Sequence, residues 1–209
     1  MIGGAEVKQT NVRGRLIDNT ISVIAAYGLD KTTTKAIVGG TNINEAYIYR
    51  YFHDKDSLLA TAFDKLDAEL VEITSSYVHL LGVKELDIEA RCRLFFKPVW
   101  EFLLGNKEKC LAFIRYYYSP YFRKYSAESH KERYGGLIES FDEVFREEAN
   151  TWMLLNHILN VMLSFAIKVF DDSVANDDDT AEHVFRLVYY STKPYFKKED
   201  GNNEDEESV

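Results

Sequence analysis

Residues 42–59 of the chain, NINEAYIYRYFHDKDSLL, crowd three tyrosines, an arginine and a phenylalanine among small and polar residues. Tyrosine hydroxyls, guanidinium groups and amide side chains donate hydrogen bonds to phosphate oxygens, and some of them reach the edges of nucleic-acid bases. A core helix would favour leucine and alanine in place of these rings. The stretch is therefore either a surface that reads nucleic acid or a set of packing rings in a helical bundle.

Three short helices are predicted to position this stretch. The first covers about residues 11–27, where apolar residues recur at helical spacing, and Gly28 then ends it at a positive φ. The second covers 34–41, capped by one of the threonines at 32–34, and the third covers 44–51. Helices this short are marginal alone, so packing must hold them. We expect their small core to consist of Leu16, Ile37, Ile43, Ile48 and Phe52.

A tight turn between the second and third helices gives the helix-turn-helix arrangement. At this point the sequence resembles the TetR family of bacterial transcriptional regulators, over residues 28–59, GLDKTTTKAIVGGTNINEAYIYRYFHDKDSLL. The resemblance covers only part of the chain, but many positions agree in one register. The matching residues are Thr33, Ile37, Ile43, Asn44, Tyr49, Tyr51, Phe52, Lys55 and Leu58.

The resemblance implies roles for individual residues. Thr33 would cap the second helix and touch a phosphate, Tyr49 would hydrogen-bond a phosphate, and Lys55 would hold another at the start of the fourth helix. The positions that read bases or touch the DNA backbone would be Asn44, Glu45, Ala46, Tyr47 and Arg50. Tyr51 and Phe52 are expected in the core.

The remainder of the chain reads as helices, and no sustained alternation predicts a sheet. Further helices are predicted at 54–80, 86–104, 107–118, 126–147, 150–171 and 179–193. The predicted fold is all-α, with a three-helix DNA-binding head joined by a long helix to a larger effector-binding and dimerisation bundle. The expected division is a flexible arm (1–10), the head (11–54), the helical body (55–196) and an acidic disordered tail (197–209).

Charge and composition narrow the function classes. The net charge is −9, yet residues 1–60 hold seven basic against six acidic residues, so the acidity belongs to the body and tail. Such a head binds DNA through few phosphate contacts. Cys92 and Cys110 form no CxxC pair, which favours free thiols in a reducing cytoplasm. We expect no secretory signal, no membrane-spanning run of roughly 18 apolar residues and no cofactor. We also expect no metal site, because His79, His130 and His183 lack the spacing of metal ligands.

An effector pocket is the second predicted site. Residues 95–145 contain 14 of the chain's 29 aromatic residues, and TetR-like proteins hold an inducer among helices of this part of the chain. We expect an aromatic or amphipathic small molecule, with a plain aromatic core as the alternative. The candidate pocket residues are Phe96, Trp100, Phe113, Tyr117, Phe122 and His157, although the preferred interpretation of His157 is a core histidine.

The two last helices are the candidate dimer interface, since a near-palindromic operator requires two heads. The candidate residues are Trp152, Leu155, Leu159, Phe185, Val188 and Tyr189. The leading hypothesis is thus a homodimeric repressor that an effector releases from DNA; activation in place of repression stays open. A helical enzyme or a scaffolding bundle is the alternative, but the sequence has no catalytic motif such as GxSxG or HExxH.

Overall fold

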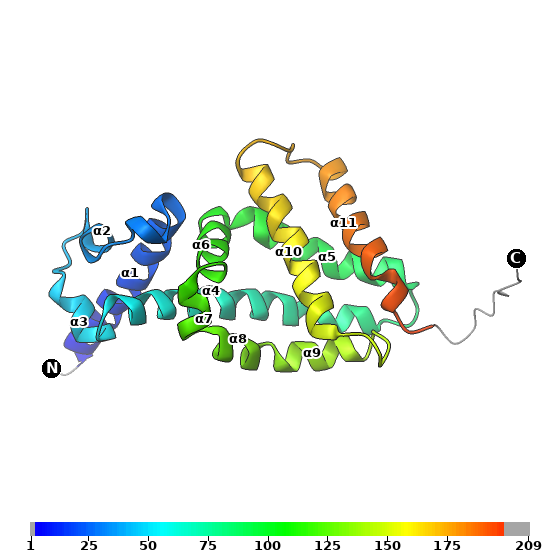
Figure 1. Cartoon of the computed structure of the whole chain (residues 1–209), viewed down its shortest axis with the longest axis horizontal. Helices are drawn as coiled ribbons and strands as arrows, with labels where there is room; N and C mark the ends of the chain where they lie inside the picture. Colours follow the sequence, from blue (N-terminus) through cyan, green and yellow to red (C-terminus); the bar gives the residue numbers. More distant parts are fainter. Residues whose placement is uncertain (1–2, 199–209) are drawn as a thin grey trace, which may run out of the picture.

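The computed structural model describes the backbone of residues 3–198 and the side chains of residues 12–198. Three helices form the head: α1 (Gly3–Tyr27), α2 (Thr34–Val38) and α3 (Ala46–Phe52). A long helix, α4 (Lys55–Val78), leaves the head and runs along the body (Figure 1). Within the described residues no strand occurs, and Phe145 and Phe196 form one isolated antiparallel bridge, so the predicted all-helical class is confirmed.

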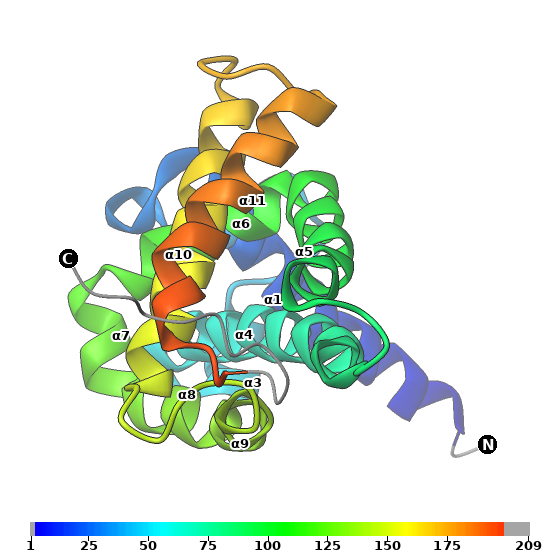
Figure 2. The same ribbon diagram turned by 90° about the vertical axis from the view of Figure 1, so that its right-hand side faces the viewer.

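The body wraps the long helix with seven more. They are α5 (Ile88–Gly105), α6 (Lys107–Tyr117), α7 (Pro120–Tyr125), α8 (Ala127–Arg133), α9 (Gly135–Asp142), α10 (Thr151–Phe170) and α11 (Asp178–Thr192). Figures 1 and 2 show α10 and α11 side by side on one flank of the body, with α7, α8 and α9 following α4 on another. Short 3-10 turns follow α1, α4 and α11. They cover Leu29–Lys31, His79–Gly82 and Lys193–Tyr195.

Helix boundaries follow the predicted signals in most places. Gly28 ends α1 at a φ of +79°, where its amide donates to the Ile24 carbonyl over 2.9 Å. Asp54 caps α4 by accepting from the Ser57 amide over 2.7 Å, which holds the pKa of Asp54 below its usual value. In the same way Asp87 caps α5, Asn150 caps α10 and Asp177 caps α11.

Four boundary predictions need correction. Helix α1 begins at Gly3, so residues 3–10 are helical where an arm was expected. The second helix ends at Val38, because Gly39 leaves the helix and Gly40 takes a φ of +73°. The single helix predicted over 126–147 is divided at Tyr134, where a Gly–Gly pair of low helix propensity follows. Helix α7 was missed, because Pro120 starts a helix here and does not merely end one.

Helix α10 crosses the core of the body. It is the one helix among the described residues that is long and apolar enough to cross a membrane, which corrects the expectation from sequence. Its buried side chains, such as Leu155 and Met162, pack inside the body, and other positions, such as Met153, are exposed. Length and composition of this kind also belong to core helices of soluble proteins. The predicted division at 54/55 stays a prediction, and most of the predicted acidic tail, residues 199–209, lies outside the described residues.

Candidate DNA-binding head and effector pocket

The small core of the head holds α3 in place. Leu16, Ile37 and Ile48 are completely buried, and Ile43 and Phe52 are nearly so, as predicted. Because Ile48 and Phe52 lie four residues apart, they occupy one face of α3. The opposite face of this short helix is thereby turned outward.

The outward face of α3 carries the predicted reading residues. Asn44, Ala46 and Arg50 are exposed, and Tyr49 is 55% exposed, which is unusual for so large a ring. The Asn44 side chain accepts from the Ala46 amide over 2.9 Å and so starts the helix two residues later than predicted. Glu45 is half-buried at the N-cap position but makes no side-chain cap bond there.

Aromatic stacking fixes the rest of this face. Tyr47 is half-buried, and its ring stacks on Tyr51 with centroids 5.9 Å apart. The guanidinium carbon of Arg50 lies 5.9 Å from the Tyr47 ring and 6.0 Å from the Tyr51 ring. Tyr51 is therefore a half-buried packing ring, and its buried hydroxyl has no hydrogen-bond partner within the described part of the chain. The tyrosines thus divide between the two interpretations: Tyr51 packs, and Tyr49 is presented.

Thr33 and Lys55 lie at helix N-termini beside this face. Thr33 accepts from the Ala36 amide over 3.1 Å and caps α2. Lys55 is the first residue of α4, where the helix dipole favours an anion. Its ammonium lies 6.0 Å from the ring centroid of Tyr121 in α7. Lys55 therefore lies where the head joins the body, beside α7.

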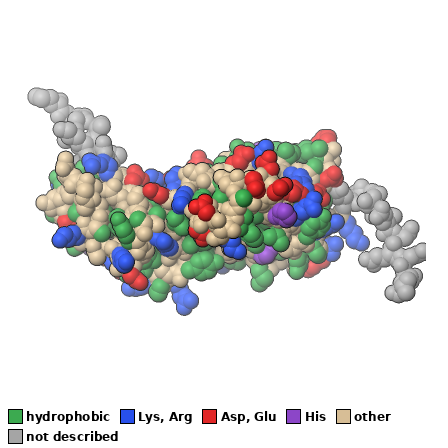
Figure 3. Space-filling view, turned by 90° about the horizontal axis from the view of Figure 1, so that it is seen from above, with side chains coloured by type: hydrophobic (Ala, Val, Ile, Leu, Met, Phe, Trp, Pro, Cys, Tyr) green, Lys and Arg blue, Asp and Glu red, His purple; other side chains and the backbone are tan. Residues whose placement is uncertain are grey.

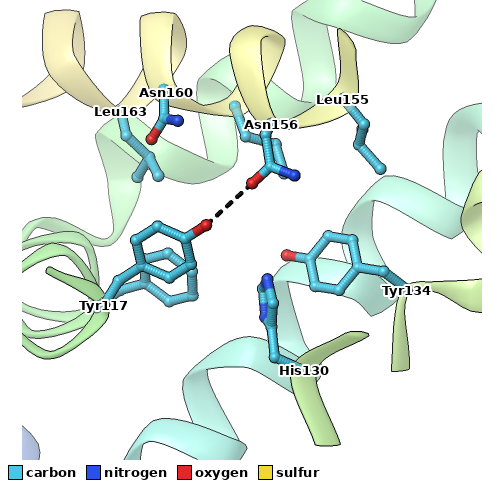
Figure 4. A pocket seen from close by; sticks show the side chains of 9 residues that line it. Tyr117, His130, Tyr134, Leu155, Asn156, Asn160 and Leu163 are labelled. Carbon is cyan, nitrogen blue, oxygen red and sulfur yellow. Dashed lines mark hydrogen bonds between the residues drawn. The ribbon is translucent and has the colours of Figure 1, made fainter. Parts of the chain in front are cut away.

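A small cavity lies in the body between α6, α8 and α10 (Figure 4). Its volume is about 20 Å³, which is room for about one water molecule. One wall is apolar, and a few polar side chains converge on the other. The lining residues are Phe113, Tyr117, His130, Tyr134, Leu155, Asn156, Leu159, Asn160 and Leu163.

A buried cluster of charged side chains adjoins the cavity through His130. Asp67 of α4 is 0% exposed; it lies 2.8 Å from His130 Nδ1 and accepts from Arg133 Nη1. Arg133 also contacts Asp64, with Nη2 and Oδ1 3.2 Å apart. An ionised carboxylate only accepts hydrogen bonds, so the His130 proton sits on Nδ1. In the neutral imidazole, Nε2 is then an acceptor.

Two tyrosines complete the polar wall. The Tyr117 hydroxyl donates to Asn156 Oδ1 over 3.0 Å, as the dashed line in Figure 4 shows. Tyr134 is 2% exposed, and its hydroxyl has no hydrogen-bond partner among the described residues. Burial raises the pKa of Tyr134 well above its usual value and also raises the pKa of Tyr117. Both remain protonated hydrogen-bond donors.

Comparison with known families decides what the head is. Residues 16–62 match the sequence pattern described as "Bacterial regulatory proteins, tetR family". The match covers the small core, the outward face of α3 and the start of α4. Residues 16–62 thus match the N-terminal domain pattern of the TetR family.

Solved structures extend the likeness to the TetR fold as a whole. A TetR family transcription regulator from Marinobacter aquaeolei VT8 is similar with a TM-score of 0.75 and 14% identity, over 92% of this chain and 100% of that one. A TetR-like transcriptional regulator from Rhodococcus sp. RHA1 gives 0.61 and 16%, over 87% and 96%. The multidrug binding protein EbrR, complexed with imidazole, gives 0.62 and 14%, over 91% and 98%. Comparison with curated proteins finds no match to this sequence.

In this TetR-type body, the predicted pocket residues separate into three places. Phe113 and Tyr117 line the cavity, and Phe122 packs on Tyr117 with centroids 4.5 Å apart. Phe96 and Trp100 stack on each other in a second aromatic cluster, with Phe96 against Phe185 of α11. His157, in contrast, is exposed.

His157 Nε2 lies 2.8 Å from Ser191 Oγ on the surface, which removes this side chain from both the core and the pocket. Sequence analysis missed His130, Tyr134, Asn156 and Asn160. The available signal was the four-residue spacing of His130 and Tyr134, which places both on one helical face. Among the described residues no group of three His, Cys, Asp or Glu could hold a metal ion.

The structure places the predicted interface residues mainly inside one protomer. Five of the six are buried inside the protomer and Trp152 is half-buried, so their side chains serve its own core. The buried five are Leu155, Leu159, Phe185, Val188 and Tyr189. The helical spacing of apolar residues identifies the apolar face of a helix. It does not tell whether the same chain or a second chain covers that face. The exposed apolar side chains of these two helices include Met153, Leu187 and Tyr190.

Proposed function

We propose that the protein is a homodimeric, sequence-specific DNA-binding regulator that a small-molecule effector releases from its operator, acting as a repressor in the cytoplasm. The observation that carries the proposal is the outward face of α3 inside the segment that matches the TetR family. Transcription regulators with this fold are the structural neighbours of the chain.

The DNA contacts follow from exposure and chemistry. Tyr49 and Arg50 donate hydrogen bonds from the outward face of α3, and Lys55 offers a charge at the start of α4. Asn44 and Ala46 are small enough to let the helix approach base edges in the major groove. Figure 3 shows acidic side chains gathered over the body on the face in view, whereas residues 1–60 hold seven basic against six acidic residues.

A dimer supplies the second head. Met153 is 66% exposed on α10, while Leu187 and Tyr190 on α11 are 51% and 58% exposed. Because α10 and α11 lie side by side (Figure 2), these apolar groups form a surface that a second copy would cover. Two recognition helices roughly 34–36 Å apart meet successive major grooves.

The effector acts by moving the head. Helix α6 holds α1 through Arg115, whose Nη1 donates to the carbonyls of Ile24 and Ala25 over 2.7 and 2.6 Å. Helix α7 holds the start of α4 through the Tyr125 hydroxyl, which donates to Asp56 over 2.9 Å. A ligand that parts the cavity walls displaces α6 and thereby tilts the head. The similar structure of the multidrug binding protein EbrR is a complex with imidazole, which supports the binding of a small molecule by a protein of this fold.

The test is a fluorescence-anisotropy titration of the protein against DNA from upstream of its own gene. We expect Tyr49→Ala to weaken binding, because the exposed hydroxyl contacts a phosphate, and Tyr27→Ala, which removes another exposed tyrosine of the head, to leave it unchanged. Equal affinities for the two variants and the wild type would mean that α3 is not the reading helix. An enzyme or a scaffold would bind DNA without steep salt dependence or not at all.

A further inference from the structure

The cavity of the body contains a buried hydroxyl that the protein itself does not satisfy. Tyr134 is 2% exposed, and no described residue meets the distance and angle of a hydrogen bond to its oxygen, although the Asp67 carboxylate lies close to it. Leaving a buried hydroxyl unpaired costs free energy, so such a group in a folded protein marks a place where a water molecule or a ligand hydroxyl can bind. Figure 4 shows this hydroxyl pointing into the space beside His130 and Asn156.

His130 supplies a complementary group at the same place. Its Nδ1 donates to Asp67, which Arg133 also binds, so the ring is held from behind by an ion cluster. The ring lies between Tyr117 and Tyr134 in Figure 4, and with the proton on Nδ1 a neutral ring would leave Nε2 as a hydrogen-bond acceptor. An acceptor nitrogen and a donor hydroxyl therefore converge on one point of the cavity.

We propose that His130 and Tyr134 bind a hydroxyl group of a neutral effector whose body is an apolar ring, a phenol in the simplest case. A hydroxyl group both donates and accepts, so it pairs with Nε2 of His130 and with the Tyr134 hydroxyl at once. The ring would lie against Phe113, Leu159 and Leu163. This inference rests on the effector role proposed above and names the chemistry that the effector site recognises.

Other ligand charges fit the site less well. A carboxylate has only acceptors, so it would face the lone pair of Nε2 and the nearby carboxylate of Asp67. An ammonium group donates to Nε2 but leaves the Tyr134 hydroxyl without an acceptor.

Because the cavity is small, binding of an effector requires the residues that line it to move. About 20 Å³ accepts a hydroxyl but not a ring, so the ring must part side chains that belong to α6 and α10. Recognition of the hydroxyl and movement of the lining helices are therefore coupled, which is what a regulator requires of its effector site.

The experiment measures ligand binding to the purified full-length protein by calorimetry, with no DNA present. Phenol is the probe, and toluene, benzoate and benzylamine are ring compounds of similar size without the neutral hydroxyl. We expect phenol to bind roughly tenfold more tightly than toluene, in line with one or two net hydrogen bonds. Fluorescence of Trp152 gives a second readout in a Trp100→Phe background, because its ring lies 5.6 Å from His130 and 5.9 Å from Tyr134.

Two matched variants separate recognition from folding. Tyr134→Phe removes the hydroxyl at constant ring size, and we expect it to lower phenol affinity roughly three- to tenfold while toluene binding stays the same. Tyr51→Phe removes the other buried tyrosine hydroxyl without a partner, in the head, and should change neither. Urea unfolding midpoints verify that both variants fold.

Four outcomes would overturn the inference: no phenol binding, equal phenol and toluene affinities, tighter binding of benzoate or benzylamine, or an unchanged phenol affinity in Tyr134→Phe. Each leaves the DNA-binding proposal standing, because that proposal is tested in a separate titration. If the protein binds phenol selectively but does not bind DNA, the DNA-binding proposal fails and the inference about the effector site stands.

Discussion

Neutralising Asp67 is expected to destabilise the body far more than neutralising a surface carboxylate. Asp67 is completely buried and bonds to His130 and Arg133, whose guanidinium side chain is 24% exposed. Breaking a buried ion pair on one side costs about 3–5 kcal/mol, because the remaining charge is left desolvated. Asp67→Asn moderates this loss, since its amide oxygen still accepts from Nδ1 and Arg133 keeps Asp64. We therefore expect a loss of about 2–3 kcal/mol in the free energy of unfolding.

The assay is urea unfolding followed by far-ultraviolet circular dichroism, at one fixed protein concentration because a dimer's stability depends on it. Asp18→Asn is the matched control. Asp18 pairs with Lys65 over 2.6 Å, but the two side chains are 60% and 41% exposed, so the loss should stay below about 1 kcal/mol. Equal losses for the two variants would refute the description of Asp67 as the centre of a desolvated ion cluster.

Three further predictions concern the stability of the head, the stability of the body at acidic pH and the dimer interface. Thr33→Ala should lower the free energy of unfolding by about 1 kcal/mol in urea titrations, because it removes the cap of α2; no loss would mean that the cap does not hold the helix. Hydrogen bonds from Arg93 and Arg186 lower the pKa of Glu182 from 4.5 to about 2, so the stability that this carboxylate adds is full above pH 4.5 and lost as the pH falls toward 2. The difference in unfolding midpoint between wild type and Glu182→Gln should shrink over that range, and a pH-independent difference would contradict the assignment. Tyr190→Glu should yield monomers in light scattering, whereas Leu94→Glu, at another exposed apolar side chain on α5, should not; a dimeric Tyr190→Glu protein would place the interface elsewhere.

The head was predictable because its determinants are local. The helical spacing of apolar residues over 11–27, a glycine after α1 and a threonine before α2 each act within a few residues of themselves. Tyr49 and Tyr51 illustrate the limit of such reasoning. The resemblance gave Tyr49 a phosphate, and Tyr51 was expected to be a packing ring of the core, yet only the structure shows that Tyr51 stacks on Tyr47 and keeps an unpaired hydroxyl.

The pocket was only half predictable, because its polar wall is assembled from distant segments. Phe113 and Tyr117 were found from aromatic density. His130 gains its role from Asp67, 63 residues earlier in the chain, and no local pattern reports that pairing. His157 misled because it lies within an apolar helix, whereas the structure turns its side chain to the surface. Burial of Leu155 and Val188 against their own chain was equally invisible to periodicity.

The salt dependence of DNA binding tests the central claim most directly. The slope of log affinity against log salt counts the phosphates that the protein neutralises, at about 0.9 per contact. Lys55→Ala should make the slope shallower by about 1.8 in a dimer that loses two contacts. Lys97→Ala removes an equal charge from a 79% exposed side chain on α5 and should leave the slope unchanged. A slope that is the same in all three proteins, or no binding at low salt, would contradict the assignment of the head as a DNA-binding surface.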